Sequence, residues 1–277
     1  MRERLSKKPE IADILTPSFG VGCRRLTPGP GYLEALVEPN VSFISDRIAS
    51  ITPTSVVLEN GKDIEVDVLV CATGFNTSAP PAFEIYGKHG VSIADRFKPY
   101  PATYLSLAVD GFPNYFTMLG PNAGVGSGSL TMIVESQGDY FIKCIRKLQK
   151  EDYATMSPKS ERVDDFMEFV GEYFKRTVYM DECNSWYRSE GGKGDRITGL
   201  WPGSSLHAIE TFRAPRWEDW EFESVEGAKN RLRWLGNGWS ITQQGQGDPA
   251  FYLEDVDVPR AGRPEGEQET LGRPFSH

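Results

Sequence analysis

Two adjacent arginines have the clearest chemical potential in this chain. Arg24 and Arg25 end a glycine-rich stretch, residues 17–25, with the sequence Pro-Ser-Phe-Gly-Val-Gly-Cys-Arg-Arg. A guanidinium is permanently charged and offers a planar fork of donors, so this pair could bind a phosphate or stabilise an oxyanion. The alternative is that the two arginines are solvated or ion-paired at the surface, where such pairs contribute little to the stability of the fold.

A second candidate site follows a short apolar run. Val66 and residues 68–70 are too few for a helix and rich in β-branched side chains, which predicts a strand buried on both faces. Ala72, Thr73 and Gly74 come directly after it. Small residues at the carboxyl end of such a strand allow backbone to approach a ligand closely. The alternative is a core strand followed by an ordinary turn.

A third candidate is the glycine-rich loop at residues 120–129, which precedes a predicted helix. The helix is indicated by apolar residues at helical spacing: Leu130, Ile133, Val134, Phe141, Ile145 and Leu148. The unpaired N–H groups of its first turn could face an anion or an electron-rich ring edge. A plain connection capped by Ser127 or Ser129 is the other interpretation.

Several elements must position these residues. Residues 41–51 and 55–59 are predicted to form strands of a meander, with Asn60-Gly61 as the hairpin turn. A short helix is expected over residues 32–37, and another buried strand over 114–119. A second long helix, residues 157–178, carries an aromatic stripe interpreted as core packing: Phe166, Phe169, Val170, Tyr173 and Phe174.

The bulk properties exclude several classes of function. The 277 residues carry a net charge of -9, which argues against a nucleic-acid partner. No apolar run is long enough to span a membrane, and the first residues lack the apolar core of a signal peptide. The cysteines and the three histidines show no metal-site spacing. We therefore expect no metal, four reduced thiols (Cys23, Cys71, Cys144 and Cys183) and a cytoplasmic protein.

Two motifs resemble one family of flavoproteins. The sequence VLVCATGF, residues 68–75, and the element GCRR, residues 22–25, are similar to those of Baeyer–Villiger-type flavin-containing monooxygenases, which use FAD and NADPH. The resemblance implies that Arg25 is the catalytic arginine beside the flavin. It also implies that Arg24, where the family more often has Lys, contacts the 2′-phosphate of NADPH.

The same resemblance extends to other cofactor contacts. Trp186, in the sequence Ser-Trp-Tyr, matches a Trp that reaches the nicotinamide ribose, although a packing Trp is an equal alternative. Ser129 and Leu130 would lie against the flavin ring, and Thr73 and Gly74 near FAD or the domain junction.

The chain also departs from the family pattern. The similarity runs from about residue 17 to 221, but no strand–Gly-x-Gly-x-x-Gly–helix unit precedes it, and the family's Phe-x-Gly…His…Trp fingerprint is absent. The chain therefore resembles the C-terminal part of such an enzyme. A fragment, the product of a wrongly delimited gene and a shortened relative all stay open.

The predicted fold class is α/β. The chain would be part of a two-dinucleotide-binding-domain flavoprotein, with a β-meander, a buried strand and helices, and without the N-terminal Rossmann ADP-binding unit. The expected division is the end of the NADP-binding domain and return linker (1–40), the C-terminal part of the FAD-binding domain (41–155), a helical and Trp-rich region (156–235) and a loosely packed tail (236–277).

The function implied is insertion of one oxygen atom of O2 next to a ketone carbonyl, with a bulky, apolar ketone as the substrate. A sibling enzyme that oxidises nitrogen or sulfur is the first alternative. A non-catalytic remnant without a complete FAD site is the second.

Overall fold

The computed structural model describes residues 1–27, 29–74, 80–227, 229–240, 242–246 and 250. The chain divides into two units, Met1–Lys229 and Asn230–His277, and all the candidate site residues belong to the first. The described part of the second unit includes the short 3-10 helix η4 (Arg233–Leu235). Most of the predicted tail, 236–277, lies outside the described residues, and the domain division drawn from the sequence stays a prediction.

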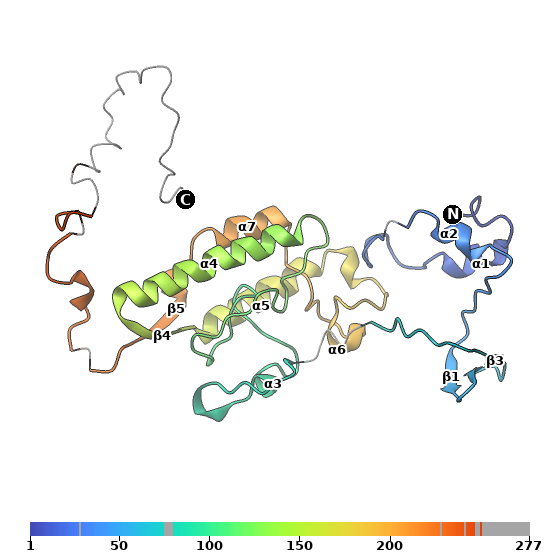
Figure 1. Ribbon diagram of the computed structural model, residues 1–277, viewed down its shortest axis with the longest axis horizontal. Coiled ribbons are helices and arrows are strands. Elements are labelled where there is room, and N and C mark those ends of the chain that lie inside the picture. Colours follow the sequence, from blue (N-terminus) through green and yellow to red (C-terminus); the bar gives the residue numbers. More distant parts are fainter. Residues whose placement is uncertain (28, 75–79, 228, 241, 247–249, 251–277) are drawn as a thin grey trace, which may run out of the picture. The chain divides into compact units, whose positions relative to one another are not determined.

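Helices predominate in the first unit (Figure 1). The α-helices are α1 (Pro9–Leu15), α2 (Tyr32–Leu36), α3 (Ile93–Arg96), α4 (Leu130–Glu151), α5 (Ser160–Phe174), α6 (Ser189–Gly192) and α7 (Ser205–Phe212). The 3-10 helices are η1 (Lys88–Gly90), η2 (Val178–Met180) and η3 (Trp217–Asp219). The strands are β1 (Ile48–Ile51), β2 (Ser55–Leu58), β3 (Asp63–Glu65), β4 (Tyr153–Pro158) and β5 (Trp220–Ser224).

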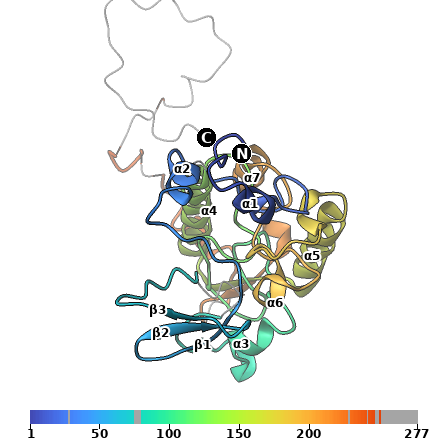
Figure 2. The ribbon, with the colours of Figure 1, turned by 90° about the vertical axis from the view of Figure 1, so that its right-hand side faces the viewer.

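The predicted meander is confirmed as the antiparallel sheet β1-β2-β3 (Figure 2). Its second turn depends on Asn60 and Gly61. Gly61 has a φ of +85°, and the side-chain carbonyl of Asn60 accepts a hydrogen bond from the Lys62 amide at 2.9 Å. The first strand is shorter than predicted, because pairing with β2 begins only at Ile48.

The long helix after the glycine-rich loop is confirmed as α4. Its apolar spacing places Ile133, Tyr140 and Cys144 on one buried face. The Ser129 hydroxyl accepts a hydrogen bond from the Met132 amide at 3.4 Å, so Ser129 is the cap of the helix. α4 packs against α7 and β4, and Figure 1 shows α4 and α7 side by side.

The second long helix, α5, is shorter at both ends than the sequence predicts. Residues 153–158 pair with β5 as strand β4, so the helix begins at Ser160 and ends at Phe174. The aromatic stripe is core only in part. Phe166 and Phe174 are buried, whereas the side chain of Phe169 is 47% exposed.

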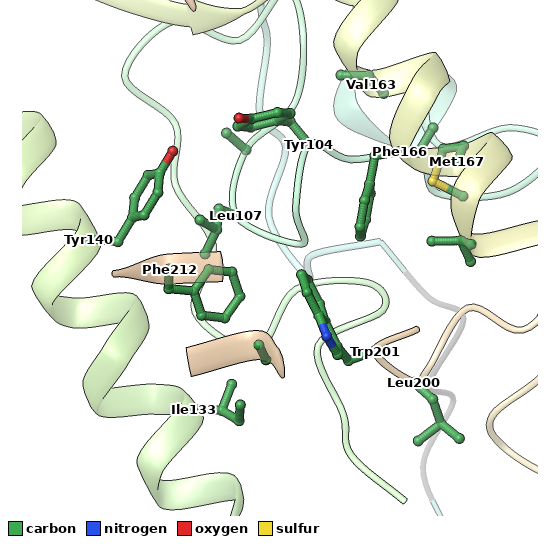
Figure 3. Close-up of a cluster of buried hydrophobic side chains, with 14 of the residues drawn as sticks. Tyr104, Leu107, Ile133, Tyr140, Val163, Phe166, Met167, Leu200, Trp201 and Phe212 are labelled. Carbon is green, nitrogen blue, oxygen red and sulfur yellow. The ribbon is translucent and has the colours of Figure 1, made fainter. Parts of the chain in front are cut away.

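One aromatic cluster forms the main core and joins α4, α5 and α7 (Figure 3). The Phe212 ring meets Trp201 at a centroid distance of 5.2 Å and the edge of Tyr140 at 6.4 Å. Phe166 packs on Trp201 at 5.6 Å. Edge and tilted contacts of this kind add to the stabilisation from burial.

The buried strand predicted over residues 66–70 is wrong. Val68 and Val70 are 77% and 82% exposed, and the segment forms no strand. A strand buried on both faces needs neighbouring strands and covering helices, and the described residues supply neither around this segment. Ala72, Thr73 and Gly74 are exposed as well. The last residue of the VLVCATGF motif, position 75, lies outside the described residues.

The strand predicted over residues 114–119 is also wrong. Asn114 and Leu119 have positive φ angles, +58° and +55°, which interrupt an extended conformation. Only Phe116 makes a bridge in this segment, to Ala108. The apolar run therefore folds as consecutive turns.

A smaller apolar cluster gathers the first residues of the chain. Leu5, Ile11 and Val37 are buried together, so α1 and α2 share a local core. Arg4 and Glu34 form a bidentate ion pair beside it, with oxygen–nitrogen distances of 2.5 and 2.6 Å.

Within the described residues, no helix has the length and apolarity needed to cross a membrane.

Candidate functional site

The glycine-rich stretch of residues 17–25, which we call the arginine loop, lies at the surface. Arg24 and Arg25 are both exposed, and the Arg24 guanidinium stacks over the Phe19 ring at 5.2 Å from its centroid. Arg25 lies close to Tyr187. Burial raises the pKa of Tyr187, and the positive charge of Arg25 opposes that rise. Arg25 makes no ion pair with any residue that the structure describes, so its charge faces solvent and Tyr187.

A disulfide fixes this loop to a distant segment, which corrects the prediction of four reduced thiols. Cys23 and Cys183 are bonded, with a Cα–Cα distance of 6.5 Å, and both are buried. Cys71 and Cys144 are free thiols, exposed and buried respectively. The pairing was missed because 160 residues separate the two half-cystines, and sequence spacing carries no information about contacts made by tertiary folding.

Asp181 makes a second link between the same two segments. Its carboxylate Oδ2 accepts a hydrogen bond from the Gly20 amide at 3.0 Å. Its main-chain carbonyl accepts one from Arg188 Nη1, also at 3.0 Å. Asp181 therefore connects the arginine loop to the segment that contains Trp186.

The Trp186 segment is anchored by its neighbour. The Tyr187 side chain is buried, and its main-chain carbonyl accepts hydrogen bonds from the amides of Thr198 and Gly199 at 2.8 and 2.9 Å. The Trp186 ring lies 4.5 Å from that of Tyr187, centroid to centroid, and Trp186 is 50% exposed. Residues 185–187 and 197–200 together form a wall, held by these hydrogen bonds. The half-exposed indole of Trp186 on this wall can cover a flat ligand.

The glycine-rich loop lies beside the same wall. Asn122 Nδ2 donates to the carbonyls of Ile197 and Leu200 at 2.7 and 3.0 Å. The Gly124 amide donates to the Gly199 carbonyl at 2.9 Å. A Cβ at position 124 would lie 2.5 Å from that carbonyl oxygen, so this close approach requires glycine.

Two tyrosines connect the arginine loop with the glycine-rich loop. The rings of Tyr179 and Tyr187 meet edge to face at 5.7 Å. The Tyr179 hydroxyl lies where a Cβ at Gly126 would be, 1.9 Å from the ideal position. Arg25, Tyr187, Tyr179 and Gly126 thus form a chain of neighbours that ends three residues before Ser129.

The structure therefore gathers most of the predicted site residues into one assembly. Arg25 lies beside Tyr187, the neighbour of Trp186, and residues 197–200, which bind Tyr187, also bind the loop that leads to Ser129 and Leu130. Both residues at the start of α4 are exposed. The described contacts do not join Thr73 and Gly74 to this assembly.

Sequence reasoning missed several residues that build the site, namely Cys23, Cys183, Asp181, Asn122 and Tyr179. One signal was present. Cys23 directly precedes Arg24, and Cys183 lies three residues before Trp186, so each half-cystine adjoins a predicted nucleotide contact. Asn122 and Tyr179 act through packing and backbone hydrogen bonds, for which a single sequence offers no pattern.

In the described part of the chain, no three His, Cys, Asp or Glu side chains gather as metal ligands. His207 has a packing role, since its Nδ1 accepts a hydrogen bond from the indole of Trp201 at 3.0 Å.

Known proteins similar to this chain are flavin-containing monooxygenases. The FAD-binding monooxygenase stcW of Emericella nidulans is 36% identical over 264 residues, which are 92% of this chain and 43% of the relative. The FAD-binding monooxygenase tazF of Aspergillus terreus is 38% identical over 255 residues, 91% of this chain and 45% of the relative. A Baeyer-Villiger monooxygenase of Pseudomonas aeruginosa is 30% identical over 199 residues, 71% and 37% of the two chains. No family model matches the sequence.

Solved structures give the same result. A closed cyclohexanone monooxygenase superposes with a TM-score of 0.71 at 27% identity, covering 81% of this chain and 44% of that one. The NADP+-bound cyclohexanone monooxygenase from Rhodococcus sp. Phi1 gives a TM-score of 0.70 at 25% identity, with the same coverage. The chain spans less than half the length of the relatives it matches. It corresponds to the C-terminal part of a Baeyer–Villiger-type flavin-containing monooxygenase.

Proposed function

We propose that this chain supplies the nicotinamide-facing part of an FAD-dependent, NADPH-using monooxygenase that inserts one oxygen atom of O2 next to a ketone carbonyl. The observation that carries the proposal is the assembly around Arg25. The arginine loop is fastened to the Trp186 segment, in which the Tyr187 carbonyl accepts hydrogen bonds from Thr198 and Gly199. Residues 197–200 are in turn hydrogen-bonded to the glycine-rich loop before α4. Absence of a nucleic-acid partner and a cytoplasmic location stay predictions of the sequence.

The exposed donors of this assembly fit the two cofactors chemically. Arg24 offers a guanidinium fork suited to a phosphate, and Trp186 offers a half-exposed aromatic face. The first turn of α4 presents N–H groups beside exposed Ser129. The described residues contain no Gly-x-Gly-x-x-Gly unit for the ADP half of FAD, so the proposal covers the nicotinamide and isoalloxazine sides.

Relatives support the same cofactors. Their names include FAD-binding monooxygenases, and solved neighbours contain NADP or both FAD and NADP. Bound FAD would supply the redox chemistry with O2. The roles left to this chain are binding and charge. Arg24 would hold the 2′-phosphate, Trp186 would cover the ribose, and Arg25 would stabilise negative charge developing on the substrate oxygen.

The NADPH assignment is tested with a matched pair of ligands. NADP+ and NAD+ differ by the 2′-phosphate, so isothermal titration of the 277-residue chain should show a clear preference for NADP+. Arg24→Ala should remove that preference, because the phosphate loses its charged partner. Arg47→Ala, which removes an exposed arginine just before the meander, is the control and should preserve it. Equal binding of NADP+ and NAD+ by the unaltered chain would overturn the assignment.

The reaction is tested in a chimera in which this chain replaces the matching C-terminal part of the monooxygenase tazF. With NADPH, O2 and a bulky, apolar ketone we expect ester or lactone, and Arg25→Ala should abolish product while FAD absorbance persists. Product from an amine or a sulfide only would identify the nitrogen- or sulfur-oxidising sibling. A yellow chimera that oxidises none of the three would identify a non-catalytic remnant.

A further inference from the structure

We propose that Asp181 and the Cys23–Cys183 disulfide form a two-point clasp that positions Arg25 relative to Trp186. Nucleotide binding by this chain would then depend on the redox state of the disulfide. The inference rests on the proposed function for its ligand, NADPH, but the clasp itself is defined by contacts of the chain alone. Asp181 is a positioning residue in this arrangement, since it acts through the arginine loop.

The first point of the clasp is specific to a glycine. Asp181 Oδ2 accepts the Gly20 amide hydrogen bond at 3.0 Å. A Cβ at position 20 would lie only 2.5 Å from the same oxygen, so a side chain there would displace the carboxylate. The contact joins residues 161 positions apart in the sequence, and it serves no helix or strand.

The second point is covalent and lies three residues along the loop. Cys23 is bonded to Cys183, two residues after Asp181. Two attachments, one at each end of the 20–23 turn, prevent the loop from pivoting on either one. Arg24 and Arg25 directly follow Cys23 in the sequence, so the disulfide determines where their backbone lies.

The loop has few other contacts to hold it. Val21 and Leu26, which flank the half-cystine, are 80% and 72% exposed. The opposing wall is rigid by comparison, because Tyr187 is buried and hydrogen-bonded through its backbone. Opening the clasp should therefore move Arg25 and leave Trp186 in place.

The chemical switch is a thiol–disulfide exchange. A dithiol reductant transfers two electrons and two protons to the Cys23–Cys183 bond, which breaks to give two thiols, and the reductant becomes its cyclic disulfide. Of the two points of the clasp, only the Gly20–Asp181 hydrogen bond would then remain.

The first experiment measures NADP+ affinity of the chain by titration calorimetry. Asp181→Ala should weaken binding about threefold to tenfold, as expected for the loss of one positioning hydrogen bond. Asp181→Asn retains a side-chain oxygen acceptor and should restore most of the affinity. Dithiothreitol should weaken binding in the unaltered chain and in Cys71→Ser but not in Cys23→Ser/Cys183→Ser, which is already open. Asp164→Ala, on the exposed face of α5, is the control for loss of a carboxylate.

The second experiment needs no ligand, so it separates failure of the clasp from failure of the proposed function. Trypsin cleavage after Arg24 and Arg25 should be several-fold faster in Asp181→Ala and after reduction. Dithiothreitol should also shift the indole emission of the chain, and Trp186→Phe should remove that shift. Unchanged cleavage and emission on opening both attachments would overturn the clasp whatever the NADP+ result. Faster cleavage and a Trp186-dependent shift, with no NADP+ binding by any form, would retain the clasp and overturn only its ligand.

Discussion

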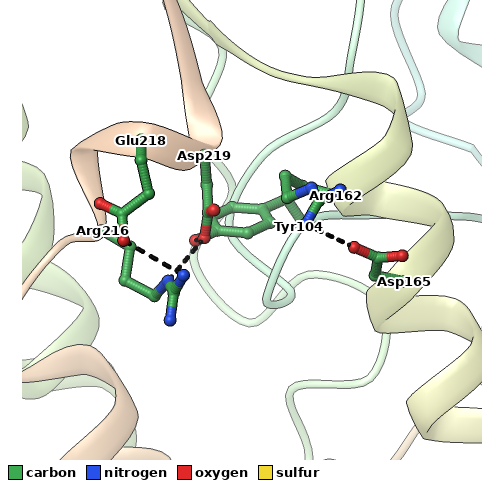
Figure 4. Close-up of polar contacts among 6 residues, drawn as sticks. All are labelled: Tyr104, Arg162, Asp165, Arg216, Glu218 and Asp219. Atoms are coloured by element: carbon green, nitrogen blue, oxygen red, sulfur yellow. Dashed lines mark hydrogen bonds and ion pairs between the residues drawn. The ribbon is translucent and has the colours of Figure 1, made fainter.

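The Tyr104 hydroxyl donates a 2.6 Å hydrogen bond to Asp219 Oδ2, a buried contact that spans 115 residues (Figure 4). Arg216 Nε shares the same oxygen at 3.1 Å. Burial raises the pKa of Tyr104 well above its usual value, so the phenol stays a donor throughout the working pH range. The pair ties the turn at 103–109 to the start of β5.

Tyr104→Phe should lower the free energy of unfolding by about 1.5–3 kcal/mol, since a buried carboxylate loses a hydrogen bond. Urea unfolding followed by circular dichroism measures it. Tyr86→Phe is a matched control, because Tyr86 donates to Glu84 at the surface and its removal should leave the unfolding midpoint unchanged. Equal effects of the two substitutions would contradict the structural role of Asp219.

The two phenylalanines of α5 should differ in their contribution to stability. Phe166 is 6% exposed and packs on Trp201, so Phe166→Ala should cost about 3–5 kcal/mol. Phe169→Ala removes the same atoms from a half-exposed position and should cost much less. Thermal or urea unfolding of the two variants measures the two losses of stability. A larger loss for Phe169→Ala than for Phe166→Ala would mean that the structure has the wrong face of α5 in the core.

Gly126→Ala should destabilise the chain by about 1–3 kcal/mol through overpacking, because the new Cβ meets the Tyr179 hydroxyl. Tyr179→Phe removes the clashing oxygen, so the cost of Gly126→Ala should fall in that background. Unfolding measurements on the four members of this cycle give the coupling. If the two single-variant losses of stability simply add in the double variant, Gly126 and Tyr179 are not in contact.

The Arg4–Glu34 pair should appear in the acid titration. The hydrogen bond from Arg4 lowers the pKa of Glu34 to about 2. Because the folded pKa lies below the unfolded value of about 4.3, the stabilisation is present above about pH 4.3 and is lost as the pH falls towards 2. The pair is exposed, so the effect should be small and should weaken with salt.

Carboxyl NMR measures the Glu34 midpoint directly. Arg4→Ala should return it towards the ordinary value, whereas Arg2→Ala, which removes a neighbouring arginine paired with Asp13, should leave it low.

Thiol reactivity should distinguish the four cysteines. Burial raises the pKa of Cys144 to about 12, so this thiol stays protonated and unreactive at about pH 8. The native chain should therefore react with a disulfide reagent at Cys71 only, and unfolding should add Cys144. Cys23 and Cys183 should react only after reduction. Three or four reactive thiols in the unfolded, unreduced chain would contradict the disulfide.

Local patterns predicted the parts of the fold that local forces determine. The strand-like runs and the Asn60-Gly61 turn were sufficient to predict the meander, and the apolar spacing after Ser129 was sufficient to predict α4. The run at 66–70 failed because its composition describes a strand that is buried between neighbours, and composition cannot supply the neighbours. The prediction for residues 114–119 failed because Asn114 and Leu119 adopt positive φ angles, which Asn tolerates but Leu rarely adopts.

The candidate site shows the same division. The motif residues Arg24, Arg25, Trp186 and Ser129 were predicted from the resemblance to the family. The residues that hold them, such as Asp181 and Cys183, depend on contacts between segments about 160 residues apart. Apart from the positions of the two cysteines near Arg24 and Trp186, such contacts have no local signature.

The disulfide between Cys23 and Cys183 also closes residues 23–183 into a covalent ring, from which residues 1–22 and 184–277 extend as two linear ends. α2 to α5 all lie within the ring, whereas α1 and α7 lie on the ends. A single cut anywhere in the ring would release no piece, so a nicked chain would stay one covalent molecule until a reductant is added.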